Sequence, residues 1–256
     1  MEPTDEKPFD EVGEFVATLL ATPAHRLTNC AGWTAHELVA HMAGGAAEEA
    51  DLIEAHLAGR PRATRPFEER EPAYRALPDA ELRDRLVEEA GRLASVLAKL
   101  EADGTDPVQF TGRAMTAADF AMHSRSECAL HRWDLAGRDD AGWALLGQPC
   151  LTAHALTVLA QMSTLPETPA NRLAGYLGAP TVRAIIRSAP HDDVVLTVVA
   201  GAVTLALEPI SDAPPALELD AAARLLLLWG RREPSAPIDV YATGRDAEIV
   251  SVLLEA

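Results

Sequence analysis

Cysteine is scarce in this sequence. The 256 residues include three cysteines, Cys30, Cys128 and Cys150. Their number is odd and no two of them have the Cys-x-x-Cys spacing, so neither a disulfide framework nor a cysteine-ligated zinc ribbon is indicated. This pattern fits a protein of a reducing compartment.

The sequence also lacks a long apolar run and an excess of positive charge. No stretch approaches about eighteen uninterrupted apolar residues, and residues 1–12 lack a basic region followed by an apolar one. We therefore expect a cytoplasmic protein that does not enter a membrane. The formal charge of −17 comes from 39 acidic and 22 basic residues, which works against binding to nucleic acid or to an anionic membrane surface. Small molecules are the expected partners, and the chain is expected to be a monomer or a homodimer.

One stretch, residues 116–137, combines helix signals with polar side chains. Thr116 and Asp119 have the spacing of a capping box, which predicts a helix that begins there. No proline interrupts the stretch, and Gly137 stands where a left-handed C-terminal cap would end the helix near Ala136.

Two side chains of this helix could ligate a metal. At about 100° per residue, Glu127 and His131 lie one turn apart on the same face. A solvated helix pair is the common alternative at this spacing. The pattern is not His-Glu-x-x-His, which excludes the zincin proteases. Cys128 points about 100° away from Glu127, and no histidine is arranged to activate it, so a cysteine nucleophile is disfavoured.

A second predicted helix carries another histidine. Thr34 and Glu37 form a further capping box, and His41 lies in the third turn of the helix that follows. Small and apolar residues surround His41, among them Gly44 and Gly45, which indicates a helix face packed closely against a neighbour. Two glycines cost roughly 2 kcal/mol in a helix interior, so either the helix breaks there or another group approaches its backbone.

Three motifs occur together in this sequence. They are Cys30-Ala-Gly-Trp33-Thr with Glu37-Leu-Val-Ala-His41-Met-Ala-Gly-Gly45, Arg125-Ser-Glu127-Cys-Ala-Leu-His131-Arg-Trp-Asp134, and Leu225-Leu-Leu-Leu-Trp-Gly-Arg231. In this combination the chain resembles the mycothiol-dependent maleylpyruvate isomerase family, a branch of the DinB-like metal-binding helical bundles. The similarity spans nearly the whole chain, although residues 60–115 and 138–190 carry no matching motif.

The resemblance implies a metal site and a thiol cofactor. The family binds a divalent metal, usually zinc, through residues that correspond to His41, Glu127 and His131, and three protein ligands leave a position open for water, thiolate or substrate. The implied activity is that of an enzyme in which mycothiol attacks an electrophilic small molecule. It would act as a cis-trans isomerase of the maleylpyruvate isomerase type or as a thiol S-transferase. The alternative is a non-catalytic DinB-like protein that binds a metal or a ligand.

The hydrophobic pattern predicts an α+β protein in two parts, since 48% hydrophobic residues supply an ample core. Helices are predicted over residues 8–21, 34–57, 79–100, 116–136, 151–162, 220–230 and 245–254. Strands are predicted within residues 193–209, 216–219 and 238–241, with a turn at 200–201. We therefore predict a DinB-like four-helix bundle over residues 1–150 and a small α+β domain over residues 151–256. By resemblance, the second domain is sterol-carrier-like.

Residues 60–76 contain three prolines and five arginines and predict a long loop. This loop is either a solvated connection or a segment from which Arg62, Arg65 or Arg70 turns inward to hold a carboxylate of substrate or cofactor.

Two more residues near the predicted metal site have alternative interpretations. His123, one turn before Glu127, is a fourth ligand, an acid or base near the metal, or a polar residue further along the bundle. Asp134, one turn after His131, would either orient that histidine through its second ring nitrogen or form a surface salt link.

Overall fold

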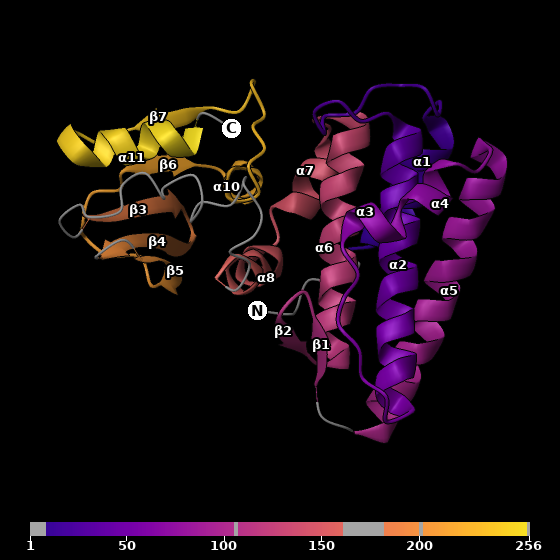
Figure 1. The fold of residues 1–256 in the computed structure, drawn as a ribbon. Coiled ribbons are helices and arrows are strands. Elements are labelled where there is room, and N and C mark those ends of the chain that lie inside the picture. The colour runs from indigo at the N-terminus through magenta and orange to yellow at the C-terminus, as the bar shows by residue number, and fades with distance from the viewer. Residues whose placement is uncertain (1–8, 105–106, 161–181, 200–201, 255–256) are drawn as a thin grey trace, which may run out of the picture. The chain divides into compact units, whose positions relative to one another are not determined.

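The computed structural model describes residues 9–104, 107–160, 182–199 and 202–254. The chain divides into two compact units, residues 1–137 and residues 138–256. Helices form most of the first unit, and a sheet with helices forms the second (Figure 1). The predicted α+β class is confirmed. The boundary that the sequence suggested at residue 150 falls inside the second unit, because α8 (Pro149–Leu159) packs on α10 (Ala221–Leu228).

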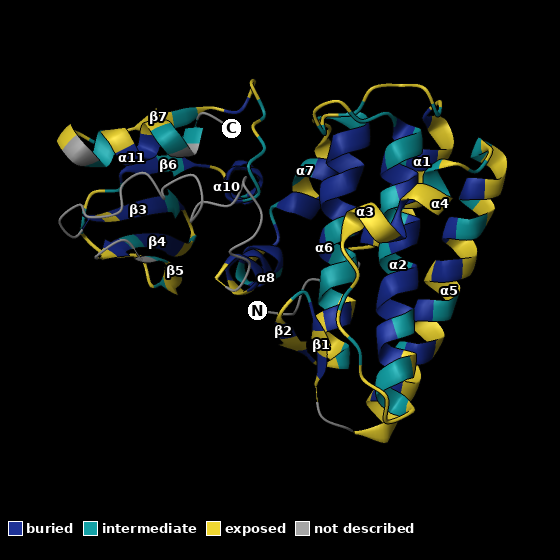
Figure 2. Ribbon diagram, in the orientation of Figure 1, coloured by how far each residue is buried: buried dark blue, intermediate teal, exposed yellow. Residues whose placement is uncertain are grey.

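The first unit is built on a helical bundle. It consists of α1 (Glu11–Ala21), α2 (Ala35–Leu57), α5 (Asp79–Asp103) and α6 (Ala117–Ala136). α2 packs against α5, α1 packs against α6, and α5 also contacts α6 (Figure 1). The sides that α1 and α5 turn toward the bundle are buried and their outer sides are exposed, whereas residues 128–135 of α6 are all buried (Figure 2). This arrangement is the predicted bundle.

Two apolar clusters hold the bundle together. The first joins α1, α2, α5 and α6 and contains Phe15, Leu38, Leu82, Cys128 and Leu135 among its buried residues. The second contains Ile53, Leu93, Phe110 and Phe120. On α2, the buried residues of the first cluster end at Ala43 and those of the second begin at Ala50, and between them only Ala46 packs against the second cluster. The middle of α2 is therefore free to carry polar side chains without breaking the apolar core.

Both predicted capping boxes are present, at Thr34 with Glu37 and at Thr116 with Asp119. α6 ends at Ala136 as predicted. Gly137 follows with φ 74° and ψ −155°, so it has a positive φ but lies outside the left-handed helical region that the sequence suggested. Glycine adopts this conformation readily because it has no Cβ.

The predicted loop over residues 60–76 contains two single-turn helices, α3 (Phe67–Arg70) and α4 (Pro72–Arg75). They pack on α2, where a Cβ on Gly44 would lie 3.5 Å from the Arg70 carbonyl oxygen. A Cβ on Gly45 would meet nothing within 4 Å. α2 therefore continues unbroken through both glycines, and the close approach involves Gly44. Elements of one turn carry too few residues for hydrophobic periodicity to reveal them.

A hairpin that the sequence analysis did not predict precedes α6. Its strands are β1 (Val108–Phe110) and β2 (Arg113–Met115). Thr111 and Gly112 join them with φ of 48° and 82°, as a two-residue hairpin turn requires.

The second unit contains a sheet with strand order β5-β4-β3-β6-β7. Its strands are β3 (Val182–Ser188), β4 (His191–Val199), β5 (Ala202–Glu208), β6 (Leu217–Leu219) and β7 (Ile238–Val240). β3 pairs parallel with β6, and the other pairs are antiparallel. The helices are α7 (Asp140–Leu146), α8, α10 and α11 (Gly244–Leu254).

The strands predicted from residue 193 onward are present, while β3 and α7 were not predicted. The turn predicted at residues 200–201 and the end of the helix predicted to reach residue 162 lie outside the described residues. Among the residues that the structure describes, no helix combines the length and the apolar character needed to cross a membrane.

Candidate metal centre

His41, Glu127 and His131 lie together in the first unit. Oε2 of Glu127 is 3.8 Å from Nε2 of His41 and 3.4 Å from Nε2 of His131, and one ligand atom from each residue lies within 4.8 Å of the other two. Ligand distances of about 2.1 Å place tetrahedral zinc ligands about 3.4 Å apart. The three atoms therefore have the spacing that a divalent cation needs.

The second ring nitrogen of each histidine faces a buried carboxylate. Nδ1 of His41 lies 2.8 Å from Oε1 of Glu71, and Nδ1 of His131 lies 2.8 Å from Oδ2 of Asp134. Glu71 is 3% exposed and Asp134 is 1% exposed, so the interpretation of Asp134 as a surface salt link is wrong. A carboxylate that accepts the Nδ1 proton fixes the tautomer and leaves Nε2 as the metal-binding atom. Both imidazoles are held in this way.

Glu71 was missed in the sequence analysis because it lies thirty residues beyond His41, in the stretch predicted as a loop. Nη2 of Arg75 donates a hydrogen bond of 2.8 Å to Oε2 of Glu71, on the side away from His41. Burial opposes ionisation of Glu71, but the hydrogen bonds with His41 and Arg75 outweigh it and lower the pKa. The carboxylate is thus anionic at neutral pH.

Burial and hydrogen bonding also oppose each other at the candidate ligands Glu127 and His131. Burial disfavours the charged form of Glu127, but hydrogen bonds with His131 and His41 hold its pKa well below the usual range. Burial also opposes protonation of His131, whereas hydrogen bonds with Asp134, Cys30 and Glu127 raise its pKa well above the usual value. The cluster therefore favours a positive charge between its carboxylates, and a divalent cation would replace the proton.

Aromatic rings and a thiol surround the imidazoles. The rings of Trp33 and Phe67 lie 5.2 Å and 5.4 Å from the His41 ring, measured between centroids. The Cys30 thiol donates a hydrogen bond of 3.1 Å to Oδ2 of Asp134. Cys30, Asp134 and His131 also lie within ligand distance of one another, but Asp134 is engaged with Nδ1 of His131. We therefore interpret this second group as support for the imidazole.

Polar residues continue along the two facing helices as matched rows. His41, Gly45 and Glu49 follow one another at four-residue spacing on α2, as do His123, Glu127 and His131 on α6. At one end, the His41 ring lies 5.3 Å from the His131 ring, measured between centroids. At the far end, Nε2 of His123 lies 3.9 Å from Oε1 of Glu49. His123 is outside the group of atoms that could hold a metal. It is a polar residue further along the bundle, as one interpretation of the sequence held.

Glu49 is the most unusual carboxyl group of this row. It is 6% exposed, and its Oε2 is buried without a hydrogen-bond partner among the described residues. Burial and the nearby negative charge of Glu127 raise the pKa of Glu49 to about 8, although Arg70 and Arg113 oppose the increase. Glu49 therefore carries a proton at neutral pH.

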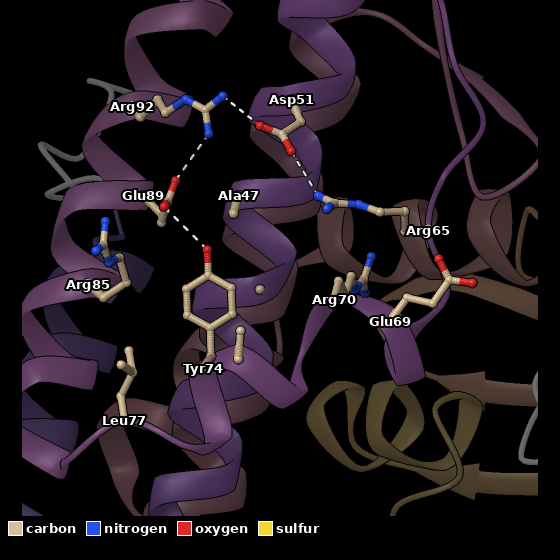
Figure 3. Close-up of a pocket in the computed structure, with 12 residues that line it drawn as sticks. Ala47, Asp51, Arg65, Glu69, Arg70, Tyr74, Leu77, Arg85, Glu89 and Arg92 are labelled. Atoms are coloured by element: carbon tan, nitrogen blue, oxygen red, sulfur yellow. Dashed lines mark hydrogen bonds and ion pairs between the residues drawn. The ribbon is translucent and has the colours of Figure 1, made fainter.

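The arginines of residues 60–76 differ in their environments. Arg62 and Arg65 bind the fully buried carboxylate of Glu48 and also reach Asp51. Arg70 turns inward and is 8% exposed. It lines a hollow of about 450 Å³ that α2, α5 and the α3–α4 segment enclose (Figure 3). None of the three candidate metal ligands lines this hollow.

Comparison with solved structures shows a shared fold. The chain is similar to the crystal structure of the mycothiol-dependent maleylpyruvate isomerase, with 18% identity and a TM-score of 0.57, and to that of an alanine mutant of such an enzyme, with 17% identity and a TM-score of 0.58. Each match covers 91% of this chain and 90% of the other. No curated protein matches the sequence.

Comparison with protein families is more specific. The profile of the mycothiol maleylpyruvate isomerase N-terminal domain matches residues 8–136. The match spans half of the chain and includes His41, Glu127 and His131. The chain therefore belongs to the mycothiol maleylpyruvate isomerase N-terminal domain family, as its motifs predicted.

Proposed function

We propose that the protein is a metal-dependent enzyme that uses a low-molecular-weight thiol, mycothiol, to act on an electrophilic small molecule. The observation that carries this proposal is the convergence of Nε2 of His41, Nε2 of His131 and Oε2 of Glu127. Two imidazoles and one carboxylate form the ligand set of an open catalytic zinc site, so zinc is the proposed metal. Family membership supports the choice of thiol.

The metal, when bound, supplies a Lewis acid that keeps a coordinated thiol deprotonated and nucleophilic at neutral pH. Glu71 and Asp134 hold the two imidazoles in the orientation that this chemistry needs. The rings of Trp33 and Phe67 flank the His41 ring. Gly45 leaves open space one turn along α2 from His41, which gives room for a ligand.

Two reactions are compatible with this arrangement. With a thiol bound, the site would support cis-trans isomerisation of a carbon–carbon double bond by reversible thiol addition, which consumes no thiol. It would equally support S-transfer, in which the thiol and its proton add to the electrophile and the product is a thioether. The family and the similar solved structures favour the isomerase.

Native mass spectrometry of the metal-loaded protein with a panel of low-molecular-weight thiols tests this proposal. We expect a complex that contains one metal and one thiol, and we expect maleylpyruvate to be converted when it is added. A change of double-bond geometry identifies the isomerase, and a released thioether identifies the transferase. Metal and thiol binding with no turnover of any electrophile would instead indicate a binding protein.

The protein's own buried thiol is not expected to be the nucleophile. Cys128 is buried in the first apolar cluster, and burial together with the charge of Glu127 raises the pKa of its thiol to about 12. We expect Cys128→Ala to retain kcat/KM within about twofold once rates are normalised to folded protein, because the thiol stays protonated at neutral pH. Loss of turnover in this variant with metal still bound would reject the cofactor thiol as nucleophile.

A further inference from the structure

Arg70 at the end of α3 carries a buried guanidinium that has no polar partner among the described residues. It is 8% exposed, and its Nε is fully buried with no hydrogen-bond partner. Within the described ranges, no hydrogen bond or ion pair joins this guanidinium to another residue. Its face stacks on the Phe67 ring at 4.4 Å, which leaves the N–H donors at its edge available. Buried donors of this kind are normally paired.

The neighbouring arginines behave differently. Arg65 and Arg92, which line the same hollow, form ion pairs with Asp51, and Arg92 also pairs with Glu89. Figure 3 marks these contacts with dashed lines, whereas none leads to Arg70. Arg70 therefore differs from Arg65 and Arg92, whose guanidinium groups are both paired with carboxylates.

Nearby carboxylates balance the charge of Arg70 without contacting it. Burial lowers the pKa of Arg70, and the negative charges of Glu71, Glu48, Glu49 and Glu127 oppose this effect. Most of these oxygens are already engaged. Glu71 is bonded by His41 and Arg75, Glu48 by Arg62 and Arg65, and Glu127 by His41 and His131. The fourth, Glu49, opposes the effect only when it is ionised, and its own pKa is raised to about 8.

Arg70 lines the hollow and is linked to the candidate metal ligands through the ring of Phe67. The guanidinium lines a space of about 450 Å³ beside Gly44, Ala47 and Tyr74, which is large enough for a small organic molecule. Phe67, on which Arg70 stacks, in turn contacts the His41 ring. A molecule held at Arg70 would therefore lie close to the candidate metal ligands.

We propose that Arg70 forms an anion subsite that binds a carboxylate group of the small molecule on which the metal centre acts. This inference rests on the proposed function. The edge of a guanidinium matches a carboxylate with two parallel hydrogen bonds. The acidic surroundings favour a carboxylate over a phosphate at Arg70, because a phosphate dianion places two charges on the one group that meets Glu71, Glu48 and Glu127, whereas each carboxylate of maleate carries one.

Binding of maleate to the metal-loaded full chain tests the subsite directly. By isothermal titration, Arg70→Gln should raise the Kd of maleate about 10- to 100-fold, and Arg70→Lys should recover part of the loss. Arg85→Gln is the matched control, because Arg85 lines the same hollow but pairs with Glu88 on the surface. Arg85→Gln should leave the Kd of maleate within about twofold of the wild-type value. Arg70→Gln should likewise leave the Kd of the uncharged dimethyl ester of maleate within about twofold of the wild-type value. Inorganic phosphate should bind more weakly than maleate.

Thermal unfolding separates a ligand-binding arginine from a structural one. Without ligand, Arg70→Gln should melt at or above the wild-type temperature, since the change removes an unpaired buried charge. Maleate affinity that is unchanged in Arg70→Gln, or tighter binding of phosphate than of maleate, would overturn the proposal, and a lowered melting temperature in Arg70→Gln would identify a structural arginine. Arg70-dependent maleate binding without any thiol-dependent turnover would keep the subsite and reject the proposed reaction.

Discussion

Replacement of His41 by alanine is expected to abolish metal binding and thiol-dependent turnover together. His41 supplies one of three proposed ligands, and the remaining pair, Glu127 and His131, lies on a single helix. Loss of an outer hydrogen-bond partner of a metal ligand typically weakens metal affinity about 10- to 100-fold. Loss of the ligand itself should exceed that range. Chelator competition monitored by metal analysis, together with initial rates, measures both effects.

Two variants control for indirect effects of the His41 substitution. Glu71→Gln keeps the imidazole ligand but replaces the carboxylate 2.8 Å from its Nδ1, so it should show the intermediate loss of about 10- to 100-fold. His56→Ala removes a histidine from the last turn of the same helix and should change neither quantity. Full thiol-dependent turnover in His41→Ala after chelation would mean that no metal-held thiolate takes part.

The second large expected effect is a pH dependence of the free energy of unfolding, and it comes from Glu49. Glu49 has its pKa raised from 4.5 to about 8 in the folded metal-free chain. Between these values the unfolded chain has lost the proton while the folded chain keeps it, so the free energy of unfolding falls as pH rises from about 4.5 to about 8. A tenfold difference in proton affinity between the folded and unfolded chains corresponds to about 1.4 kcal/mol. The full loss is therefore several kcal/mol at most.

Glu49→Gln should remove this loss because an amide does not titrate. Relative to wild type, the metal-free variant should gain stability as pH rises from 5 to 8, measured by urea denaturation at each pH. The charged groups that act on Glu49, namely Glu127, His123, Arg70 and Arg113, are present in both proteins, so the difference reports the titration of Glu49 together with its coupling to them. Glu88→Gln, which changes a carboxyl group whose side chain is 66% exposed, should show no such trend. Parallel pH profiles for Glu49→Gln and wild type would contradict a proton on Glu49.

Much of the first unit could be predicted because its signals are local. Capping boxes at Thr34 and Thr116 and the apolar periodicity of long helices depend on residues only a few positions apart. The spacing of Glu127 and His131 also follows from one helix. The position of His41 relative to them does not, because it depends on how α2 and α6 are aligned. The resemblance to a family supplied that information.

The missed features depend on tertiary contacts or on very short elements. Glu71 meets His41 only because α3 and α4 fold back onto α2 at Gly44. The packing of α3 and α4 on α2 also decides that Arg65 is paired and Arg70 is not. The hydrophobic periodicity of the sequence does not distinguish these two arginines. β1 and β2 have three residues each, too few for alternation to be recognised.

The matched rows on α2 and α6 limit how the sequence of this protein can vary. His41 and Glu49 are separated by two uninterrupted helical turns, so one residue inserted or deleted between them would rotate one relative to the other by about 100°. A Cβ added at Gly45 would meet nothing within 4 Å, whereas a change of length would turn Glu49 away from His123 or His41 away from Glu127. Chain length between these positions is therefore a stricter evolutionary constraint than the identity of most residues within it. In related sequences, the number of residues between the two positions would reveal whether the row is kept even where the residues themselves differ.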